Sequence, residues 1–345
     1  MTDPDGFLDA VHRRTGQVIS DARASYAGLD PELERVLGDV SVLVGNSGKG
    51  TRAHAAHLGW RAAGGEAGAP VAVNVAAAFE LLHLSALVHD DLIDGSAERR
   101  GRPTVHVSAA SRHDAERWVG DRARVSSGVA VLVGNILWSL ADTALGTVNE
   151  RARGEWNAVR TEVNLGQYLD LVASAQGGAD PARIDTLMNL KTAKYTFERP
   201  LRAGAAAADP SNTGLLEALG GFGHLVGRAF QIRDDILGVF GNSSVTGKPT
   251  GNDLREGKAT VLLARSAAVP ANVAAGVYAR VGSPDLTDAE IEKMRTAMTD
   301  DGTLEWAEQE ADACIARALR DTAWMPAHVR ADLSELARSA ADRVR

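Results

Sequence analysis

The chain has 345 residues, of which 45% are hydrophobic and 24% charged, so it can bury a substantial core. Its 37 Lys and Arg against 45 Asp and Glu give a formal net charge of −8. That balance argues against general nucleic-acid binding, which usually needs a basic face. The single cysteine, Cys314, excludes an intrachain disulfide and a cysteine zinc site.

Neither the start of the chain nor its interior predicts a membrane segment. The opening residues, MTDPDGFLDAVHRRTG, lack the basic start and apolar core of a signal peptide. The most apolar window, residues 71–88, is interrupted by Asn74, Glu80 and His83. We therefore expect a soluble, cytoplasmic protein without a transmembrane segment.

Apolar residues recur at helical spacing along almost the whole chain. Residues 71–94 are rich in Ala and Leu and too long for a strand, and residues 125–145 read as a second buried helix. Further helical stretches cover residues 156–175, 183–208, 212–241 and about 284–344. The Gly- and Pro-rich breaks between them are too short to be interdomain linkers, and no β-hairpin signal is present. We predict an all-α fold with a single domain over residues 1–345.

The first of two acidic motifs, HDDLIDG, follows a buried apolar run. Asp90 and Asp94 are four residues apart, so a helix places them on one face, about 6 Å apart along its axis, with Asp91 beside them. Like charges at this spacing repel, and the helix dipole disfavours anions at the C-terminal end of a helix. Arg99 and Arg100 could compensate, but Mg²⁺ also binds through one or two carboxylates plus substrate phosphates. The plainer alternative is a solvated helix end with surface ion pairs.

A second acidic pair makes the metal hypothesis more attractive. Asp234 and Asp235 again follow an apolar helical run, in FQIRDDILGVFG. Downstream, Lys248 and Lys258 stand in Gly-containing segments that could contact phosphate. Alone, such Gly-Lys pairs are ordinary turns, and the P-loop spacing is absent.

From about residue 45 to the C-terminus, the sequence resembles the trans-type isoprenyl diphosphate synthases, the polyprenyl synthetase family. Residues 1–44 would add N-terminal helices. The motifs that carry the resemblance follow the family order: SGKGTR, LLHLSALVHDDLIDGSAERRGRPTVH, GQYLDL, KTAKYT and FQIRDDILGVFG…TGKP…EGKAT. The resemblance implies a helical bundle of the isoprenoid synthase type around a deep central cavity, with the two acidic motifs facing each other across its mouth.

The activity implied by this resemblance is that of a prenyltransferase. Three Mg²⁺ ions would clamp the diphosphate of an allylic substrate, which is dimethylallyl, geranyl or farnesyl diphosphate. Ionisation would give an allylic carbocation, the double bond of isopentenyl diphosphate would attack it, and a proton would be lost. The released diphosphate would act as the base. The family also implies a homodimer.

The resemblance assigns roles to individual residues. The metal ligands would be Asp90, Asp94 and Asp234, with Asp91 in support. The allylic diphosphate would contact Arg99, Lys191, Lys248 and Lys258. Thr192 and Gln231 would line the carbocation site. The diphosphate of isopentenyl diphosphate would be held by Lys49, Arg52, His83 and Arg100. Each has a simpler interpretation by itself: His83, for example, could be a satisfied core histidine.

Product length can be argued from side-chain size. Ser85 and Ala86, one turn before the first aspartate, should face the growing chain. Because both are small, the product should be longer than C15. Leu82 and Phe79 lie one and two turns deeper and could form the floor of the pocket. The bulk of Phe79 favours geranylgeranyl diphosphate (C20).

Three positions depart from the family pattern. Gly238 stands where a third aspartate is common, and we expect activity to survive this change. Gly50 and Thr51 in SGKGTR remove a charge and some bulk, which makes the affinity for isopentenyl diphosphate less certain. Asn135 stands where an aspartate is usual, and the sequence gives no account of it.

Two other functions remain open. A class I terpene cyclase would need Asn, Ser or Thr, and Glu at spacings of four and eight, whereas Asn252 is followed by Glu256 and Thr260. A non-catalytic subunit of a heteromeric prenyltransferase would be expected to lose its acidic motifs, but five aspartates survive.

Overall fold

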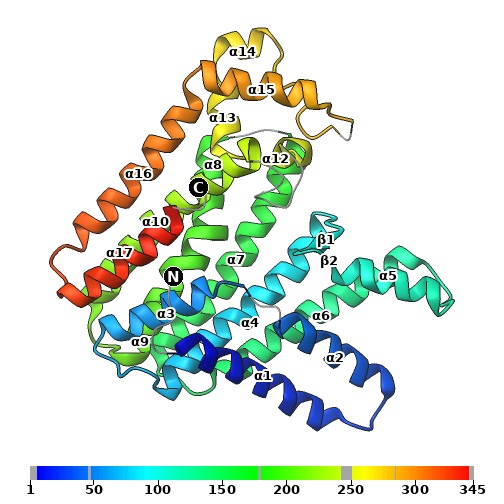
Figure 1. The fold of residues 1–345 in the computed structure, drawn as a ribbon, viewed down its shortest axis with the longest axis vertical. Coiled ribbons are helices and arrows are strands. Elements are labelled where there is room, and N and C mark those ends of the chain that lie inside the picture. Colours follow the sequence, from blue (N-terminus) through cyan, green and yellow to red (C-terminus); the bar gives the residue numbers. More distant parts are fainter. Residues whose placement is uncertain (1–5, 46–47, 178–179, 242–250, 284, 342–345) are drawn as a thin grey trace. The chain divides into compact units, whose positions relative to one another are not determined.

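The computed structural model describes residues 6–45, 48–177, 180–241, 251–283 and 285–341. Within these ranges the regular structure is helical except for one two-stranded ribbon, which confirms the predicted all-α fold (Figure 1). The chain divides into two compact units. The N-terminal unit is Thr2–Arg153 with Ala203–Asn212, and the C-terminal unit is Gly154–Arg202 with Thr213–Arg345. The single domain over residues 1–345 stays a prediction.

The N-terminal unit is built around one apolar helix, α4. Every residue from Val75 to Leu82 in α4 is buried, because the helix packs against neighbours on several sides. It packs mainly against α1, α3 and α6. The elements that belong wholly to this unit are α1 (Phe7–Tyr26), α2 (Pro31–Gly45), α3 (Thr51–Ala62), α4 (Pro70–Ile93), β1 (Glu98–Arg99), β2 (Arg102–Pro103), α5 (Val105–Ala115) and α6 (Arg122–Leu145).

Two helices of the described chain, α4 and α6, are long and apolar enough to cross a membrane by length and composition alone. In α4, 67% of the apolar window is buried inside the protein, and in α6 the share is 44%. A core helix passes the same test, so the two helices are weak evidence for a membrane span.

The ribbon directly after α4 was not expected from the sequence, and the prediction of no hairpin was wrong. Glu98 pairs with Pro103 and Arg99 with Arg102, in antiparallel register. The turn between them places Arg100 at φ 54° and Gly101 at φ 71°. Both values lie in the left-handed region, which two-residue hairpin turns require and which few residues other than glycine adopt. Strands of two residues are too short to show an alternating pattern.

The C-terminal unit is organised around α10, which packs against η1. Helices α16 and α17 also pack against α10 (Figure 1). Helix α10 is continuous in spite of its glycines, as expected for residues 212–241. The elements that belong wholly to this unit are α8 (Pro181–Met188), η1 (Asn189–Glu198), α10 (Thr213–Phe240), α12 (Asn252–Glu256), α13 (Val261–Ala267), α14 (Pro270–Ala274), α15 (Asp288–Asp300), α16 (Thr303–Asp321) and α17 (Ala327–Ala341). Helices α7 (Glu150–Gln176) and α9 (Arg199–Ala208) have residues in both units.

The stretch predicted as one helix over residues 183–208 is helical, but its middle has a different form. Between α8 and α9 lies η1, a π-helix over Asn189–Glu198. Its hydrogen bonds run from i to i+5, which widens the helix; such helices are rare and are often found at functional sites. The hydrophobic period of the sequence gives no sign of this change.

Candidate active site

The first acidic motif lies at the C-terminal end of α4, and Arg99 neutralises part of it. Nε of Arg99 donates to Oδ1 and Oδ2 of Asp91 at 2.8 and 2.9 Å. Its Nη2 atom lies 2.7 Å from Asp91 Oδ1 and 3.7 Å from Asp90 Oδ2. Asp91 is buried, at 6% exposure, whereas Asp90 is partly exposed. Arg99 therefore supplies the positive charge that the sequence required, and it is directed mainly at Asp91.

Asp94 ends α4, where its backbone N–H donates to the carbonyl oxygen of Asp90 at 2.8 Å. Asp90 and Asp94 are thus one turn apart, as predicted. In the described part of the chain, no group of three His, Cys, Asp or Glu side chains is placed to hold a metal ion by itself. Carboxylate oxygens nonetheless suit Mg²⁺, which commonly takes only one or two protein carboxylates and completes its coordination with water and phosphate oxygens.

A cationic cluster lies at the start of α3. Oε1 of Glu80 on α4 accepts a hydrogen bond from the backbone N–H of Ala53, at 3.4 Å. A Cβ atom added to Gly48 would lie 2.5 Å from Nη2 of Arg100, so the backbone at Gly48 lies against that guanidinium. Burial raises the pKa of Glu80, while the charges of Arg52 and Arg100 oppose this rise. The N-terminal unit therefore brings Arg52 and Arg100 to one place.

Two further predicted residues belong to the same neighbourhood. His83 follows Glu80 by three residues, on the same side of α4. Lys49 is exposed and immediately precedes Gly50, which has φ 64° and caps α3. The left-handed backbone gives a physical reason for glycine at this departure from the family pattern. Sequence reasoning missed Glu80, although an acid inside an apolar helix was a visible signal.

In the C-terminal unit, Thr192 and Gln231 are joined by a hydrogen bond. Thr192 Oγ1 donates to Gln231 Oε1 at 2.5 Å, and Gln231 Nε2 donates to Asp235 Oδ1 at 2.7 Å. Burial raises the pKa of Asp235 well above its usual value, and the charges of Asp253 and Asp234 add to the rise. Asp234 itself is exposed. The two acids of the second motif therefore differ, since Asp235 orients Gln231 and Asp234 faces solvent.

Lys191 and Thr192 both lie on η1, which fits closely between α7 and α10. Lys191 Nζ donates to Asp170 Oδ2 of α7 at 2.5 Å. A Cβ atom on Gly166 of α7 would lie 2.6 Å from the backbone N of Lys191. A Cβ atom on Gly227 of α10 would lie 2.3 Å from Cα of Ala193. These two glycines let α7 and α10 approach the η1 backbone closely. A side chain at either glycine would push the η1 backbone away.

The structure explains why glycine stands at position 238. A Cβ atom there would lie 1.8 Å from Oδ2 of Asp253, which belongs to α12. The carboxylate of Asp253 thus occupies the space that a side chain of residue 238 would need. Lys258 Nζ lies 3.9 Å from Asp253 Oδ1 and 2.8 Å from Glu256 Oε2. Lys248, the other predicted phosphate contact, lies outside the described residues.

The residues expected to set product length lie on α4. Phe79, Leu82 and Ser85 are each 0% exposed, and Ala86 is half-buried. Ser85 Oγ donates to the backbone carbonyl of Gly134 on α6 at 2.8 Å. Because this bond fixes the Ser85 side chain against α6, Ala86 is the better position for a bulky replacement. Their role in chain length stays a prediction.

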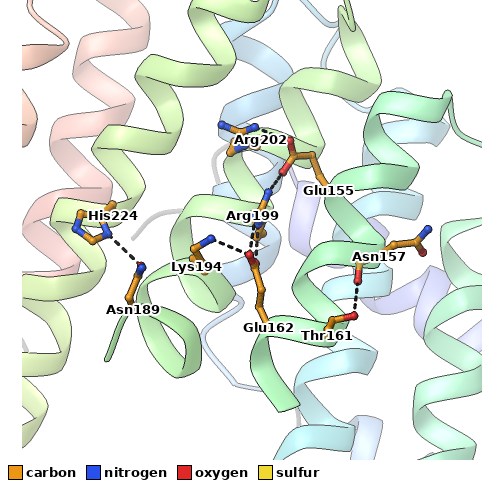
Figure 2. Close-up of polar contacts among 9 residues, drawn as sticks. All are labelled: Glu155, Asn157, Thr161, Glu162, Asn189, Lys194, Arg199, Arg202 and His224. Carbon is orange, nitrogen blue, oxygen red and sulfur yellow. Dashed lines mark hydrogen bonds and ion pairs between the residues drawn. The ribbon is translucent and has the colours of Figure 1, made fainter. Parts of the chain in front are cut away.

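An ion-pair cluster links α7 to η1 and α9 within the C-terminal unit (Figure 2). Arg199 donates through Nε and Nη2 to Glu162, at 2.7 and 2.6 Å, and through Nη1 to Glu155, at 2.5 Å. Lys194 Nζ also donates to Glu162, at 2.7 Å, and Arg202 Nη2 to Glu155, at 2.7 Å. Burial alone would raise the pKa of Glu155, but hydrogen bonds from Arg202 and Arg199 lower it. Sequence reasoning did not predict this cluster.

Replacing Glu155 with Gln should destabilise the protein at neutral pH, because this buried carboxylate is the shared partner of Arg199 and Arg202, both partly buried. We expect the unfolding free energy to fall by about 3 kcal/mol at pH 7. Since the pKa of Glu155 is lower in the folded state, its contribution is complete above the unfolded Glu pKa of about 4.3. That contribution is lost as the pH falls through the folded value. Urea unfolding at several pH values should show the two proteins converging below about pH 4.

Glu292→Gln is a matched control for this measurement. Glu292 is 64% exposed and pairs with Arg295 of the same helix, so its loss should cost about 0–1 kcal/mol at any pH. A difference between wild type and Glu155→Gln that does not change with pH would contradict the prediction.

Comparison with known proteins places the chain in a family. Residues 34–294 match the Polyprenyl synthetase family. A geranylfarnesyl diphosphate synthase of Aeropyrum pernix is 31% identical over 312 residues, which cover 88% of this chain and 91% of that protein. A geranylgeranyl diphosphate synthase of Mycobacterium tuberculosis is 37% identical over 232 residues, which cover 65% of this chain and 59% of that protein.

Among solved structures, a geranylgeranyl pyrophosphate synthase of Corynebacterium glutamicum, complexed with isoprenyl diphosphate and magnesium, is similar over the whole fold. The TM-score is 0.90 at 33% identity, with 99% of this chain and 100% of that chain covered. The chain therefore belongs to the polyprenyl synthetase family, and it is a prenyltransferase of the isoprenyl diphosphate synthase class.

Proposed function

We propose that this enzyme condenses an allylic diphosphate with isopentenyl diphosphate, with Mg²⁺ as cofactor, to give geranylgeranyl diphosphate. The observation that carries the proposal is the end of α4. Asp90 and Asp94 stand one turn apart, and Arg99 is held beside them by Asp91. This group combines hard oxygen ligands with a cation suited to a diphosphate. The Corynebacterium relative, whose structure contains isoprenyl diphosphate and magnesium, adds support.

Bound Mg²⁺, three ions in the full proposal, would supply electrostatic stabilisation of the departing diphosphate. Asp90, Asp94 and Asp234 would hold it. In the N-terminal unit, Asp91 orients Arg99 toward the allylic diphosphate. The cluster of Lys49, Arg52, His83 and Arg100 would bind the diphosphate of isopentenyl diphosphate.

In the C-terminal unit, the side chains of η1 and α10 would stabilise the cationic part of the allylic substrate. The oxygens of Thr192 and Gln231 would face the developing positive charge, with Gln231 oriented by Asp235. Lys191 and Lys258 would contact the allylic diphosphate, and Lys248 would join them. No histidine is needed as a base, since the released diphosphate can accept the proton.

Product analysis tests this function. The purified protein would be incubated with Mg²⁺, isopentenyl diphosphate and each allylic starter in turn, and the products measured by mass. We expect one longer prenyl diphosphate that requires both substrates. A hydrocarbon formed from geranylgeranyl diphosphate alone would indicate a cyclase instead. Elongation that appears only after a partner protein is added would indicate a subunit of a heteromeric enzyme.

Replacing Ala86 with Phe should shorten the product from C20 to C15. The aromatic ring would fill the space one turn before Asp90, where the growing chain is proposed to pass. Mass measurement of the products formed from geranyl diphosphate checks this result. Phe79→Leu is the opposite variant and should lengthen the product, since it lowers the proposed floor. An unchanged product in both variants would place the growing chain elsewhere.

The proposed enzyme works in the cytoplasm as a homodimer. The proposal of a second copy is supported by two adjacent apolar residues of α6, Val131 and Leu132, which are 43% and 62% exposed. Contiguous exposed apolar surface is a common feature of subunit interfaces. Sedimentation of the purified protein gives the oligomeric state directly.

A further inference from the structure

The π-helical form of η1 needs support from outside the helix. Residues Pro181–Met188 before it and Arg199–Ala208 after it are ordinary α-helix. Between them, Asn189–Glu198 keep the wider i to i+5 hydrogen bonds. A conformation this uncommon persists where surrounding contacts determine it. The contacts of η1 therefore decide where its side chains lie.

Contacts hold η1 at both ends (Figure 2). At its start, Oδ1 of Asn189 lies 3.1 Å from Nδ1 of His224 on α10. Near its end, Nζ of Lys194 donates to Oε1 of Glu162 on α7, at 2.7 Å. Arg199, the first residue of α9, donates to both oxygens of the same carboxylate. The junction between η1 and α9 is thus fastened to α7 through Glu162.

Glu162 differs from its neighbour Glu155 in where it acts. The hydrogen bonds of Glu155 go to Arg199 and Arg202, which both belong to α9. Glu162 bonds one cation inside η1 and one in α9, and its two-pronged bond with Arg199 fixes the direction of the guanidinium. Burial alone would raise the pKa of Glu162, but Arg199 and Lys194 lower it, so the carboxylate is charged at neutral pH.

We propose that Glu162 is a positioning residue for the transfer reaction. By joining Lys194 to Arg199, it holds η1 in the π-helical form that presents Lys191 to the diphosphate, and Thr192 to the carbocation site, of the allylic substrate. A return to α-helical hydrogen bonds would change the rotation per residue about the axis of η1, and so the direction of each side chain. It would thereby move Lys191 away from Asp170, and Thr192 away from Gln231. The inference rests on the proposed function, because it concerns the allylic substrate of that reaction.

Glu162→Gln tests the proposal, since glutamine keeps the size of the side chain and removes its charge. The full-length enzyme would be assayed with Mg²⁺, geranyl diphosphate and isopentenyl diphosphate. A misplacement of about 1 Å can cost on the order of 10²-fold in rate, so we expect kcat to fall by about 10- to 100-fold. The KM for geranyl diphosphate should rise. The KM for isopentenyl diphosphate should stay within about twofold, because its proposed cluster belongs to the other unit.

Glu310→Gln is the matched control. Glu310 on α16 lies in the same unit, and it accepts a hydrogen bond from Arg228 of α10 at 3.2 Å. Its kcat should match wild type even where its unfolding midpoint falls. If Glu162→Gln likewise lowers only the midpoint, with kcat and both KM values unchanged, Glu162 supports the fold alone and the proposal is wrong.

A second variant covers the case in which Glu162→Gln does not fold. Arg199→Lys keeps the positive charge but loses the two-pronged bond to Glu162. It should lower kcat and raise the KM for geranyl diphosphate, and unchanged kinetics would overturn the proposal. Wild-type turnover in the same assay tests the proposed function separately. A wild type that does not elongate contradicts the function, whereas variants that match an active wild type contradict the positioning role.

Discussion

Replacing Asp90 with Asn should lower kcat by about 10³-fold, the size of effect seen when one preorganised electrostatic contact is removed from an active site. Asn keeps the shape of Asp but loses the charge that would hold Mg²⁺ at the end of α4. The fold should be preserved, because Asp91 makes the close contacts with Arg99 while Asp90 lies 3.7 Å away. Steady-state kinetics together with circular dichroism would check both expectations.

Asp142→Asn is a control of the same chemistry. Asp142 is exposed on α6, where it accepts a hydrogen bond from Arg153 at 3.0 Å. Its replacement should leave kcat within about twofold of wild type, as usual for surface ion pairs. An Asp90→Asn enzyme that keeps more than about a tenth of the wild-type rate would show that the first motif is not an electrostatic centre.

Replacing Gly238 with Asp should reduce activity, although it restores the commoner form of the second motif. The new side chain would collide with the carboxylate of Asp253, since even a Cβ atom there lies 1.8 Å from its Oδ2 atom. Overpacking usually costs about 1–3 kcal/mol, and the two negative charges would add repulsion. We expect a lower unfolding midpoint and a kcat about tenfold below wild type.

Two further variants make this result specific. Gly221→Asp adds the same side chain to α10 at an exposed position, with nothing within 4 Å of its Cβ atom, and it should have little effect. The double variant Gly238→Asp with Asp253→Gly moves the carboxylate from α12 to α10. This double variant should recover most of the lost stability and rate. A single Gly238→Asp variant as active as wild type would contradict this prediction, because it would mean that the Asp253 side chain can move aside at little cost.

Much of the fold could be predicted from the sequence, because long apolar helices leave a strong periodic pattern. Helix α4, expected over residues 71–94, runs over Pro70–Ile93, and the helix expected over residues 125–145 runs over Arg122–Leu145. Several site residues were also brought together as the motifs suggested. Thr192 and Gln231 share a hydrogen bond, although they are 39 positions apart in sequence.

The features that the sequence did not reveal depend on tertiary contacts. The π-helical segment η1 packs closely against Gly166 and Gly227, which belong to other helices. The carboxylate of Asp253, on a separate helix, fills the space beside Gly238. The sequence motif shows only that an aspartate is missing at position 238, not why. Arg100 lies in a left-handed turn that a two-residue ribbon sets, and no propensity for single residues predicts it.

The pair between Lys191 and Asp170 has a consequence for turnover. In the proposed reaction, an arriving diphosphate has to displace an internal counterion before it meets the full charge of Lys191. After the reaction, the carboxylate of Asp170 can pair with Lys191 again. This exchange of partners would weaken the binding of the released inorganic diphosphate and favour its dissociation. A neutral side chain at residue 170 would therefore be expected to slow product release even as it tightens substrate capture.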